Sequence, residues 1–500
     1  MSPDHDESTA YRPAERVVPW LIGTAAITLT LTLACVLLVS NYFNYTGESV
    51  TLGSLLRIAA GKPYVGPLDS IPIQYNPYSP YLAWVVTPVI RLCRLTSVES
   101  IAFAGRMAVL LCFGLYVRSV ALFHKTWLPS EWRAQYFTLA VLWVMLLFPG
   151  NLTAIRPDLL SFLAEFGSFA VLCQFLSGRD GRRQLVVLAG VLAGIAMAIK
   201  TNSVGGVAGI GVVLLLERRI GVAVLFGVAT GVTLAVHLGA MYLIYGTASL
   251  MNLWFMLASQ SFSGIGLARR AHEVLDQPFV DNVLLAVFAV RGLLVIHRHD
   301  ALKARLLTAF LFGSLVVATI GQMKIGASTN YFLGAFMMAT IPLAIGLASV
   351  AAQIADDLTS RALSVGLIIL WPMLLLRTAE TPATILLNDA RHYPYRDVKA
   401  FVERTYPNAI IYTPDENAAI QFSGRTRLGP WTEAFLQVSP GLRAQLPELH
   451  RVLSGVPFTV AITTGANCAA WQPNGYFAPE TDHLRMLAKQ FDKICVFSSR

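Results

Sequence analysis

The sequence predicts a polytopic all-α membrane domain followed by a small α/β domain, on three observations. The 500 residues are 55% hydrophobic and only 13% charged, with a mean hydropathy of +0.58, which is too apolar for a soluble protein. Apolar runs of membrane-spanning length recur up to residue 377. From residue 378 the composition changes to that of a soluble domain. We therefore expect a transmembrane domain at 1–377 and a soluble domain at 378–500.

Apolar runs of roughly 17 to 25 residues, the length that crosses a bilayer, mark the candidate membrane helices. They cover residues 18–40, 100–122, 134–150, 159–177, 184–200, 203–217, 220–245, 279–297, 302–320, 331–351 and 362–377. This predicts about eleven crossings. The run 18–40 is too long for a signal peptide and lacks a small-residue cleavage pattern, so we expect it to stay as a helix with the N-terminus inside.

Basic residues gather in alternate loops, as expected for cytoplasmic loops. The clusters are Arg12 with Arg16, Arg118 with Lys125 and Arg133, Arg179 with Arg182 and Arg183, Arg218 with Arg219, Arg298 with Lys303 and Arg305, and then Arg361. The C-terminus then lies outside. Because Lys and Arg in a membrane protein report topology first, the net charge of +9 predicts no nucleic-acid partner.

The first outer loop, residues 41–99, is polar, aromatic and rich in proline. Glu48 follows the first predicted helix, where we expect its carboxylate to be ionised and reachable. Apolar residues at helical spacing over 52–61 predict a short interfacial helix that ends at Gly61. Tyr75 and Tyr78 are of the type that settles at headgroup depth. The run 81–95 is apolar enough to cross, but a crossing there would invert every later loop, so we interpret it as a juxtamembrane or partly inserted helix.

The same topology brings several ionisable residues to the outer face. Arg156 and Asp158 lie in the segment AIRPD, Lys200 lies in AIKTN, and Lys324 precedes Asn330 and Tyr331 in MKIGASTNY. Charges near membrane depth are costly and usually face a cavity or a partner. The alternative reading stays open that the carboxylates are solvated helix ends and the cations snorkel to the interface.

The C-terminal domain shows short β-branched runs alternating with helical patterns. We expect helices at 395–404, 416–424 and 482–491 and strands at 408–413, 457–464 and 493–497. Its two cysteines, Cys468 and Cys495, could pair in an oxidising compartment, although spacing alone does not prove it. No cysteine or histidine cluster has zinc spacing, and there is no Walker loop or internal repeat.

Several short segments follow one another in an informative order. They are TGES after the first predicted helix, GKPY and YNPYSPYL, RPDLL in the next outer loop, IKTN after the fifth helix, and KIGASTNYFL before a late helix, followed by an outer C-terminal domain. In this layout the chain resembles the GT-C type of membrane glycosyltransferase, the class that includes protein O-mannosyltransferases and the lipid A aminoarabinose transferases.

The resemblance implies transfer of a sugar, with inversion, from a polyprenyl-phosphate donor to a lipid, glycan or protein acceptor on the outer face of a bacterial cytoplasmic membrane. The C-terminal domain would be periplasmic. Glu48 would be the general base and Asp158 would orient its partner or the acceptor. The residues expected to bind substrate are Arg156, Lys200, Lys324, Asn330, Tyr331, Tyr75 and Tyr78, of which the cations would stabilise the leaving phosphate.

One departure from the family concerns a metal. Many relatives carry an Asp-Glu pair in the first outer loop, whereas Gly47 precedes Glu48 here. Whether Mg²⁺ or Mn²⁺ serves as cofactor therefore stays open. Two other functions stay open. One is a transporter or lipid flippase, which the lack of repeated halves disfavours. The other is a non-catalytic scaffold of envelope glycan assembly, which is favoured by the absence of an acidic residue beside Glu48.

Overall fold

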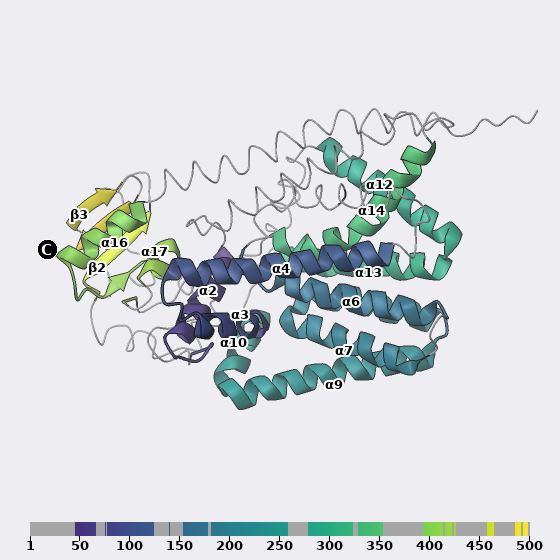
Figure 1. The fold of residues 1–500 in the computed structure, drawn as a ribbon, viewed down its shortest axis with the longest axis horizontal. Helices are drawn as coiled ribbons and strands as arrows, with labels where there is room; N and C mark the ends of the chain where they lie inside the picture. The colour runs from purple at the N-terminus through teal and green to yellow at the C-terminus, as the bar shows by residue number, and fades with distance from the viewer. Residues whose placement is uncertain are drawn as a thin grey trace, which may run out of the picture.

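The computed structural model describes residues 46–66, 76, 78–124, 140, 154–178, 182–258, 279–323, 329–353, 394–413, 416–422, 425–426, 458–464, 486–491 and 494–498. Helices dominate up to residue 353 (Figure 1). They are α2 (Thr46–Ala59), α3 (Tyr81–Leu92), α4 (Val98–His124), α6 (Asp158–Leu176), α7 (Arg183–Ile199), η2 (Thr201–Ser203), α8 (Val204–Leu216), α9 (Ile220–Tyr245), α10 (Thr247–Ala258), α12 (Phe279–His299), α13 (Ala301–Gln322), η3 (Thr329–Phe332) and α14 (Leu333–Gln353).

Within the described residues, five helices are long and apolar enough to cross a membrane. Their spanning segments are Val98–Val120, Asp158–Leu176, Ile220–Tyr245, Ala301–Gln322 and Leu333–Val350. Helices α7 and α8 also coincide with predicted runs but have only 17 and 13 residues. The predicted runs 18–40 and 362–377, and all of 134–150 except Ala140, lie outside the described residues. The count of about eleven crossings therefore stays a prediction.

The first outer loop contains two short helices where helices were predicted. Helix α3 has 12 residues, about 18 Å of helix, which is too short to cross the roughly 30 Å hydrocarbon core. Helix α2 starts at Thr46, earlier than predicted, so Glu48 lies in its first turn and not ahead of it. Gly61, with φ at 73°, turns the chain after α2 as expected. Helix α10 was not predicted.

The long helices run side by side along the longest axis of the molecule, as α4, α6, α7 and α9 show in Figure 1. Helix α6 packs on α7, α7 on α9, α8 on α13, and α12 on α14. The backbones of α8 and α13 meet at Gly205 and Gly313, where a Cβ on either glycine would overlap the backbone of the other. Small residues permit this close approach, which is typical of helix pairs in a bilayer.

The two ends of this bundle differ in charge. Helices α8 and α13 pack antiparallel, so Arg218 and Arg219 after α8 and Asp300 before α13 lie at one end, where Arg305 pairs with Glu217. Asp158 at the start of α6 and Lys200 after the end of α7 lie in contact at the other end. The predicted inner clusters and the predicted outer residues are thus separated by the length of the helices.

The C-terminal part contains helices α16 (Pro394–Thr405) and α17 (Glu416–Gln421) and the strands β1 (Ile411–Tyr412), β2 (Val460–Thr464), β3 (Met486–Phe491) and β4 (Ile494–Ser498). The sheet order is β1-β2-β4-β3, with β1 parallel to β2 and the other pairs antiparallel. Val398 and Val402 of α16 pack on Val496 and neighbouring strand residues in a separate core. Helix α17 contacts α2, and Ile420 joins the core of the helical bundle (Figure 1).

One predicted element of this part is wrong. The segment 482–491 was expected to be helical, but Met486–Phe491 forms β3 and pairs along β4. Its residues include good helix formers, yet β4 is buried along its whole length and offers an edge for pairing. Tertiary pairing therefore outweighs the local helix propensity.

Candidate functional site

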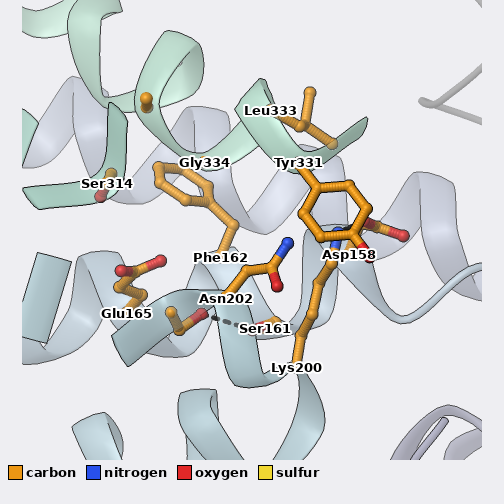
Figure 2. A pocket seen from close by; sticks show the side chains of 12 residues that line it. Asp158, Ser161, Phe162, Glu165, Lys200, Asn202, Ser314, Tyr331, Leu333 and Gly334 are labelled. Carbon is orange, nitrogen blue, oxygen red and sulfur yellow. Dashed lines mark hydrogen bonds and ion pairs between the residues drawn. The ribbon is translucent and has the colours of Figure 1, made fainter. Parts of the chain in front are cut away.

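Asp158, Lys200 and Tyr331 converge on one pocket, which residues of α6, η2, α13, η3 and α14 line (Figure 2). Pro157 directly precedes α6, and its fixed φ suits the start of a helix. Asp158 then lies in the first turn, where a carboxylate complements the helix dipole. Lys200 follows the last residue of α7 in an extended conformation, with φ at −147° and ψ at 118°. This interruption between α7 and η2 turns its side chain toward Asp158.

Lys200 links the other two residues. Its Nζ forms an ion pair with Oδ1 of Asp158 and lies 5.6 Å from the centroid of the Tyr331 ring, within the range of a cation–π contact. The side chain of Lys200 is 15% exposed and that of Asp158 is 3% exposed. A paired cation with part of its surface open can accept an additional anion without first being brought into place.

Tyr331 is held by its surroundings. Its ring lies against Gly321 near the end of α13, where a Cβ would overlap the ring. The pKa of Tyr331 is raised to about 12, mainly by burial; the nearby Tyr78 and Asp158 contribute to this rise, and Arg156 opposes it. The hydroxyl therefore remains a neutral hydrogen-bond donor at physiological pH. The same interactions show that Tyr78 and Arg156 lie in the electrostatic neighbourhood of the pocket.

Tyr78 reaches this neighbourhood through a fixed loop. Nδ2 of Asn76 donates to Oγ of Ser54 on α2 at 2.6 Å, and the backbone N–H of Asn76 donates to Oδ1 of Asn252 on α10 at 2.9 Å. Oδ1 of Asn76 accepts from the backbone N–H of Tyr78 at 2.9 Å. A segment rich in proline cannot form a regular pattern of backbone hydrogen bonds. Asn76 instead accepts a hydrogen bond from one backbone N–H group here.

Glu48 lies close to this site but does not line the pocket. Arg106 of α4 donates to both of its carboxylate oxygens, from Nε at 2.8 Å and from Nη2 at 3.4 Å, and the backbone N–H of Ile155 donates to Oε1 at 3.3 Å. Glu48 is only 2% exposed. The expectation that this carboxylate is reachable is thus wrong, because α2 packs its first turn against α4. Ile155 lies three residues before Asp158, so both carboxylates flank one short segment.

Two charged residues near the site were not predicted as site residues from the sequence. Arg106 and Glu165 both lie inside apolar runs that were interpreted only as membrane helices, and both are buried. An ionisable residue in such a run is itself a signal, because its burial requires a partner or a polar cavity. Glu165 lines the same pocket two helical turns further along α6 than Asp158 (Figure 2).

Other predicted site residues cannot be compared in the same way. Lys324 and Tyr75 lie outside the described residues, and of Asn330 only the backbone, in η3, is described. Cys495 on β4 is disulfide-bonded. Its predicted partner, Cys468, lies outside the described residues, so the pairing of these two stays a prediction.

The residues around Glu48 do not fit a divalent cation. Its oxygens already accept hydrogen bonds from Arg106 and from a backbone N–H, and the residue before it is a glycine. In the part of the chain that the structure describes, no three His, Cys, Asp or Glu side chains form a group that could hold a metal. A hard cation needs several oxygen ligands, whereas a guanidinium occupies this carboxylate.

The chain has the fold of the GT-C type membrane glycosyltransferases that its sequence resembles. It superposes on ArnT from Cupriavidus metallidurans in the apo state with a TM-score of 0.60 and 13% identity, over 97% of this chain and 98% of that chain. The same ArnT bound to undecaprenyl phosphate gives a TM-score of 0.59 and 12% identity, over 96% and 98% of the two chains.

A second structure shares the fold more distantly. The apo oligosaccharyltransferase from Archaeoglobus fulgidus gives a TM-score of 0.53 and 11% identity, over 88% of this chain and 69% of that chain. No family model matches the sequence, and no curated protein matches it. At these identities the likeness shows the fold alone, so the activity has to be argued from the residues of the site.

Proposed function

We propose that this chain is a membrane glycosyltransferase that moves a sugar from a polyprenyl-phosphate donor to a lipid, glycan or protein acceptor. One observation carries the proposal: Asp158, Lys200 and Tyr331, distant in sequence, line a single pocket at one end of a bundle with the ArnT fold. ArnT was solved with undecaprenyl phosphate, and the archaeal oligosaccharyltransferase with dolichol-phosphate and an inhibitory peptide. These ligands support a lipid-phosphate donor here.

Cations at the mouth of the pocket would bind the donor phosphate. Lys200 is fixed by Asp158, and the buried Arg156 contributes positive potential close by. The hydroxyl of Tyr331 can donate a hydrogen bond to a phosphate oxygen. Preorganised donors of this kind stabilise the charge that develops on a leaving phosphate. The polyprenyl tail would lie between helices, and Lys324, Asn330 and Tyr75 are proposed to complete the substrate site.

Asp158 is the better candidate for the proton acceptor. A general base must come within hydrogen-bond reach of the acceptor hydroxyl, directly or through one water. Asp158 lines the pocket, whereas the oxygens of Glu48 are occupied by Arg106 and Ile155 outside it. We therefore assign the base to Asp158 and a positioning role to Glu48, which holds the segment that carries Arg156 and Asp158.

The reaction proposed is a single displacement at the anomeric carbon. The acceptor oxygen forms a bond to that carbon as the bond to the donor phosphate breaks, which inverts the configuration. The acceptor proton passes to Asp158, and the electron pair leaves with the polyprenyl phosphate, whose added charge Lys200 and Arg156 would stabilise. The chain's own cations supply the charge stabilisation at the leaving group.

The pocket is proposed to open on the outer face of a bacterial cytoplasmic membrane. The opposite end of the bundle carries Arg218, Arg219 and Arg298, which the positive-inside rule assigns to the cytoplasm. The N-terminus would then be cytoplasmic, and residues 378–500 would form a periplasmic domain. Contact between α17 and α2 at the pocket end of the bundle supports this placement.

Substitution of each carboxylate tests the assignment. Envelope glycolipids and glycans are compared by mass spectrometry in cells that lack the protein or express the parent, Asp158→Asn or Glu48→Gln. We expect a sugar-sized mass difference with the parent that Asp158→Asn abolishes, because an amide does not take up the proton. Glu48→Gln should retain reduced transfer, since the amide can still accept from Arg106. Full transfer by purified, folded Asp158→Asn would refute the base assignment, and no mass difference with the parent would refute the function.

A further inference from the structure

The pocket extends from Lys200 toward Glu165, and this inner part is a polar chamber within the helical bundle. Its inner wall is formed by Ser161 and Glu165 of α6, Asn202 and Ser203 of η2, and Gly334 of α14 (Figure 2). Glu165 lies seven residues after Asp158, about 10 Å further along the helix. Polar side chains at this depth are costly unless they meet a partner.

Two groups in this chamber have unused hydrogen-bonding capacity. Glu165 is only 3% exposed, and its Oε1 has no hydrogen-bond partner among the described residues. The amide Nδ2 of Asn202 likewise lacks a partner among them. An acceptor and a donor without partners among the described residues thus belong to two side chains that line one chamber. A buried polar group without a partner is costly, so a bound polar group would stabilise both.

The hydroxyl groups beside them are already committed. Oγ of Ser161 donates to the backbone carbonyl of Ala196 or shares a hydrogen with Oγ of Ser203, each at 2.9 Å. These contacts tie η2 to α6 and fix the backbone of Asn202. The acceptor and the donor are thus held on rigid elements at a fixed separation, as expected of a preformed site.

We propose that this chamber binds the sugar of the donor, with one sugar hydroxyl donating to Glu165 and another accepting from Asn202. The inference rests on the proposed function and adds an orientation to it. Glu165 and Asn202 offer no cation to a phosphate, whereas Lys200 at the mouth attracts one. The phosphate therefore lies at the mouth and the sugar ring points inward, which leaves the anomeric carbon beside Asp158. A hydroxylated ring provides both a donor and an acceptor, which an apolar tail does not.

Gly334 allows the chamber to be narrowed without a change of charge. A Cβ at this position would lie 3.7 Å from Oε2 of Glu165 and 3.8 Å from Cδ2 of Phe162, both ordinary contact distances. Gly334→Ala should therefore fold, yet it places a methyl group on the chamber wall. Gly211→Ala is the matched control, because Gly211 also lies in a helix and its Cβ would meet nothing within 4 Å.

The experiment measures binding of the detergent-purified full chain to undecaprenyl phosphate and to the same lipid carrying glucose, mannose or galactose. We expect at least one sugar-bearing lipid to bind about tenfold tighter than the bare lipid phosphate, the gain of roughly one good hydrogen bond. Gly334→Ala and Glu165→Leu, which has no acceptor for the sugar hydroxyl, should remove most of that gain and leave binding of undecaprenyl phosphate unchanged. Gly211→Ala should match the parent.

Each other outcome is decisive. A parent that binds every sugar-bearing lipid no tighter than undecaprenyl phosphate would show that the chamber holds only water, and the inference would fail while lipid-phosphate binding stands. Equal weakening of both kinds of lipid by Gly334→Ala would also overturn it. Failure of the parent to bind any of these lipids would instead refute the proposed function on which the inference rests.

Discussion

The guanidinium of Arg106 donates to both carboxylate oxygens of Glu48, at 2.8 and 3.4 Å, and this buried pair joins α4 to the first turn of α2. Both side chains are at most 4% exposed. In such surroundings two opposite charges stabilise each other, but either one alone is expensive to bury. The pair therefore holds α2, and with it the segment from Ile155 to Asp158, in place.

Arg106→Leu should destabilise the protein strongly, by about 3 to 5 kcal/mol, because it leaves Glu48 buried without its cation. The measurement is thermal unfolding in detergent. Arg305→Leu is the control: Arg305 pairs with Glu217 but its side chain is 55% exposed, so its loss should cost no more than about 1 kcal/mol. Equal shifts in Tm for both variants would contradict a structural role for the buried pair.

Cys495 should resist alkylation unless the protein is first reduced, because it is disulfide-bonded. Because Cys495 is buried in the folded protein, peptide mapping after treatment with a maleimide in denaturant measures this, and the free Cys93 gives the positive control. If Cys468 is the partner, as predicted, Cys468→Ser should make Cys495 reactive without reductant. A Cys495 that stays protected in Cys468→Ser would rule out that pairing.

Much of the helical architecture follows from hydrophobic length. The runs 100–122, 159–177 and 220–245 coincide with α4, α6 and α9 within two residues at each end, because a bilayer admits only apolar segments with satisfied backbones. The α3 segment could be placed only by combining its length with the alternation of basic loops. Segment 486–491 was predicted wrongly because its pairing with β4 cannot be recognised from local residues, although β4 itself was predicted as a strand.

Site residues could be predicted where a charged residue lies at the end of an apolar run. Asp158 and Lys200 were found in this way, whereas Tyr331 was proposed from the family resemblance, and all three line one pocket. The partner of Glu48 was not found, because a pairing across 58 positions between α2 and α4 has no local signature. Glu165 could have been found from its position inside an apolar run, but the space around its carboxyl group depends on Gly206 and Gly334, which come from two other helices.

Membrane topology can be measured with a reporter that is active only outside the cytoplasm. Fused after Arg377, it should be active, since the predicted loop alternation puts the C-terminal part outside. Fusions at Gly181 and Asp300 should be silent, because these positions accompany the basic clusters. An active fusion at Asp300 would invert the proposed orientation, and with it the side on which the pocket opens.

Tyr331 should remain neutral well above the usual range for tyrosine. Burial raises its pKa to about 12, so its stabilising contribution is complete below about pH 10, the ordinary tyrosine pKa, and is lost as the pH rises through about 12. The difference in absorbance at the tyrosinate band between the parent and Tyr331→Phe should therefore be flat up to about pH 11 in the folded protein. Ionisation of one additional tyrosine near pH 10 would show that Tyr331 is solvated.

Gly321→Ala should weaken binding of undecaprenyl phosphate although it touches no charged group. The new Cβ would overlap the ring of Tyr331, which has to move away from Lys200 and from the phosphate proposed to lie beside it. Loss of one hydrogen bond and part of a cation–π contact corresponds to about a tenfold rise in Kd.

The substitution itself should not destabilise helix α13, because alanine is a better helix former than glycine by up to about 1 kcal/mol. Gly227→Ala on α9, where a Cβ meets nothing within 4 Å, controls for the substitution itself. The ring would be irrelevant to the ligand if Gly321→Ala bound undecaprenyl phosphate as tightly as that control, and a Tyr331→Phe variant should then also bind like the parent.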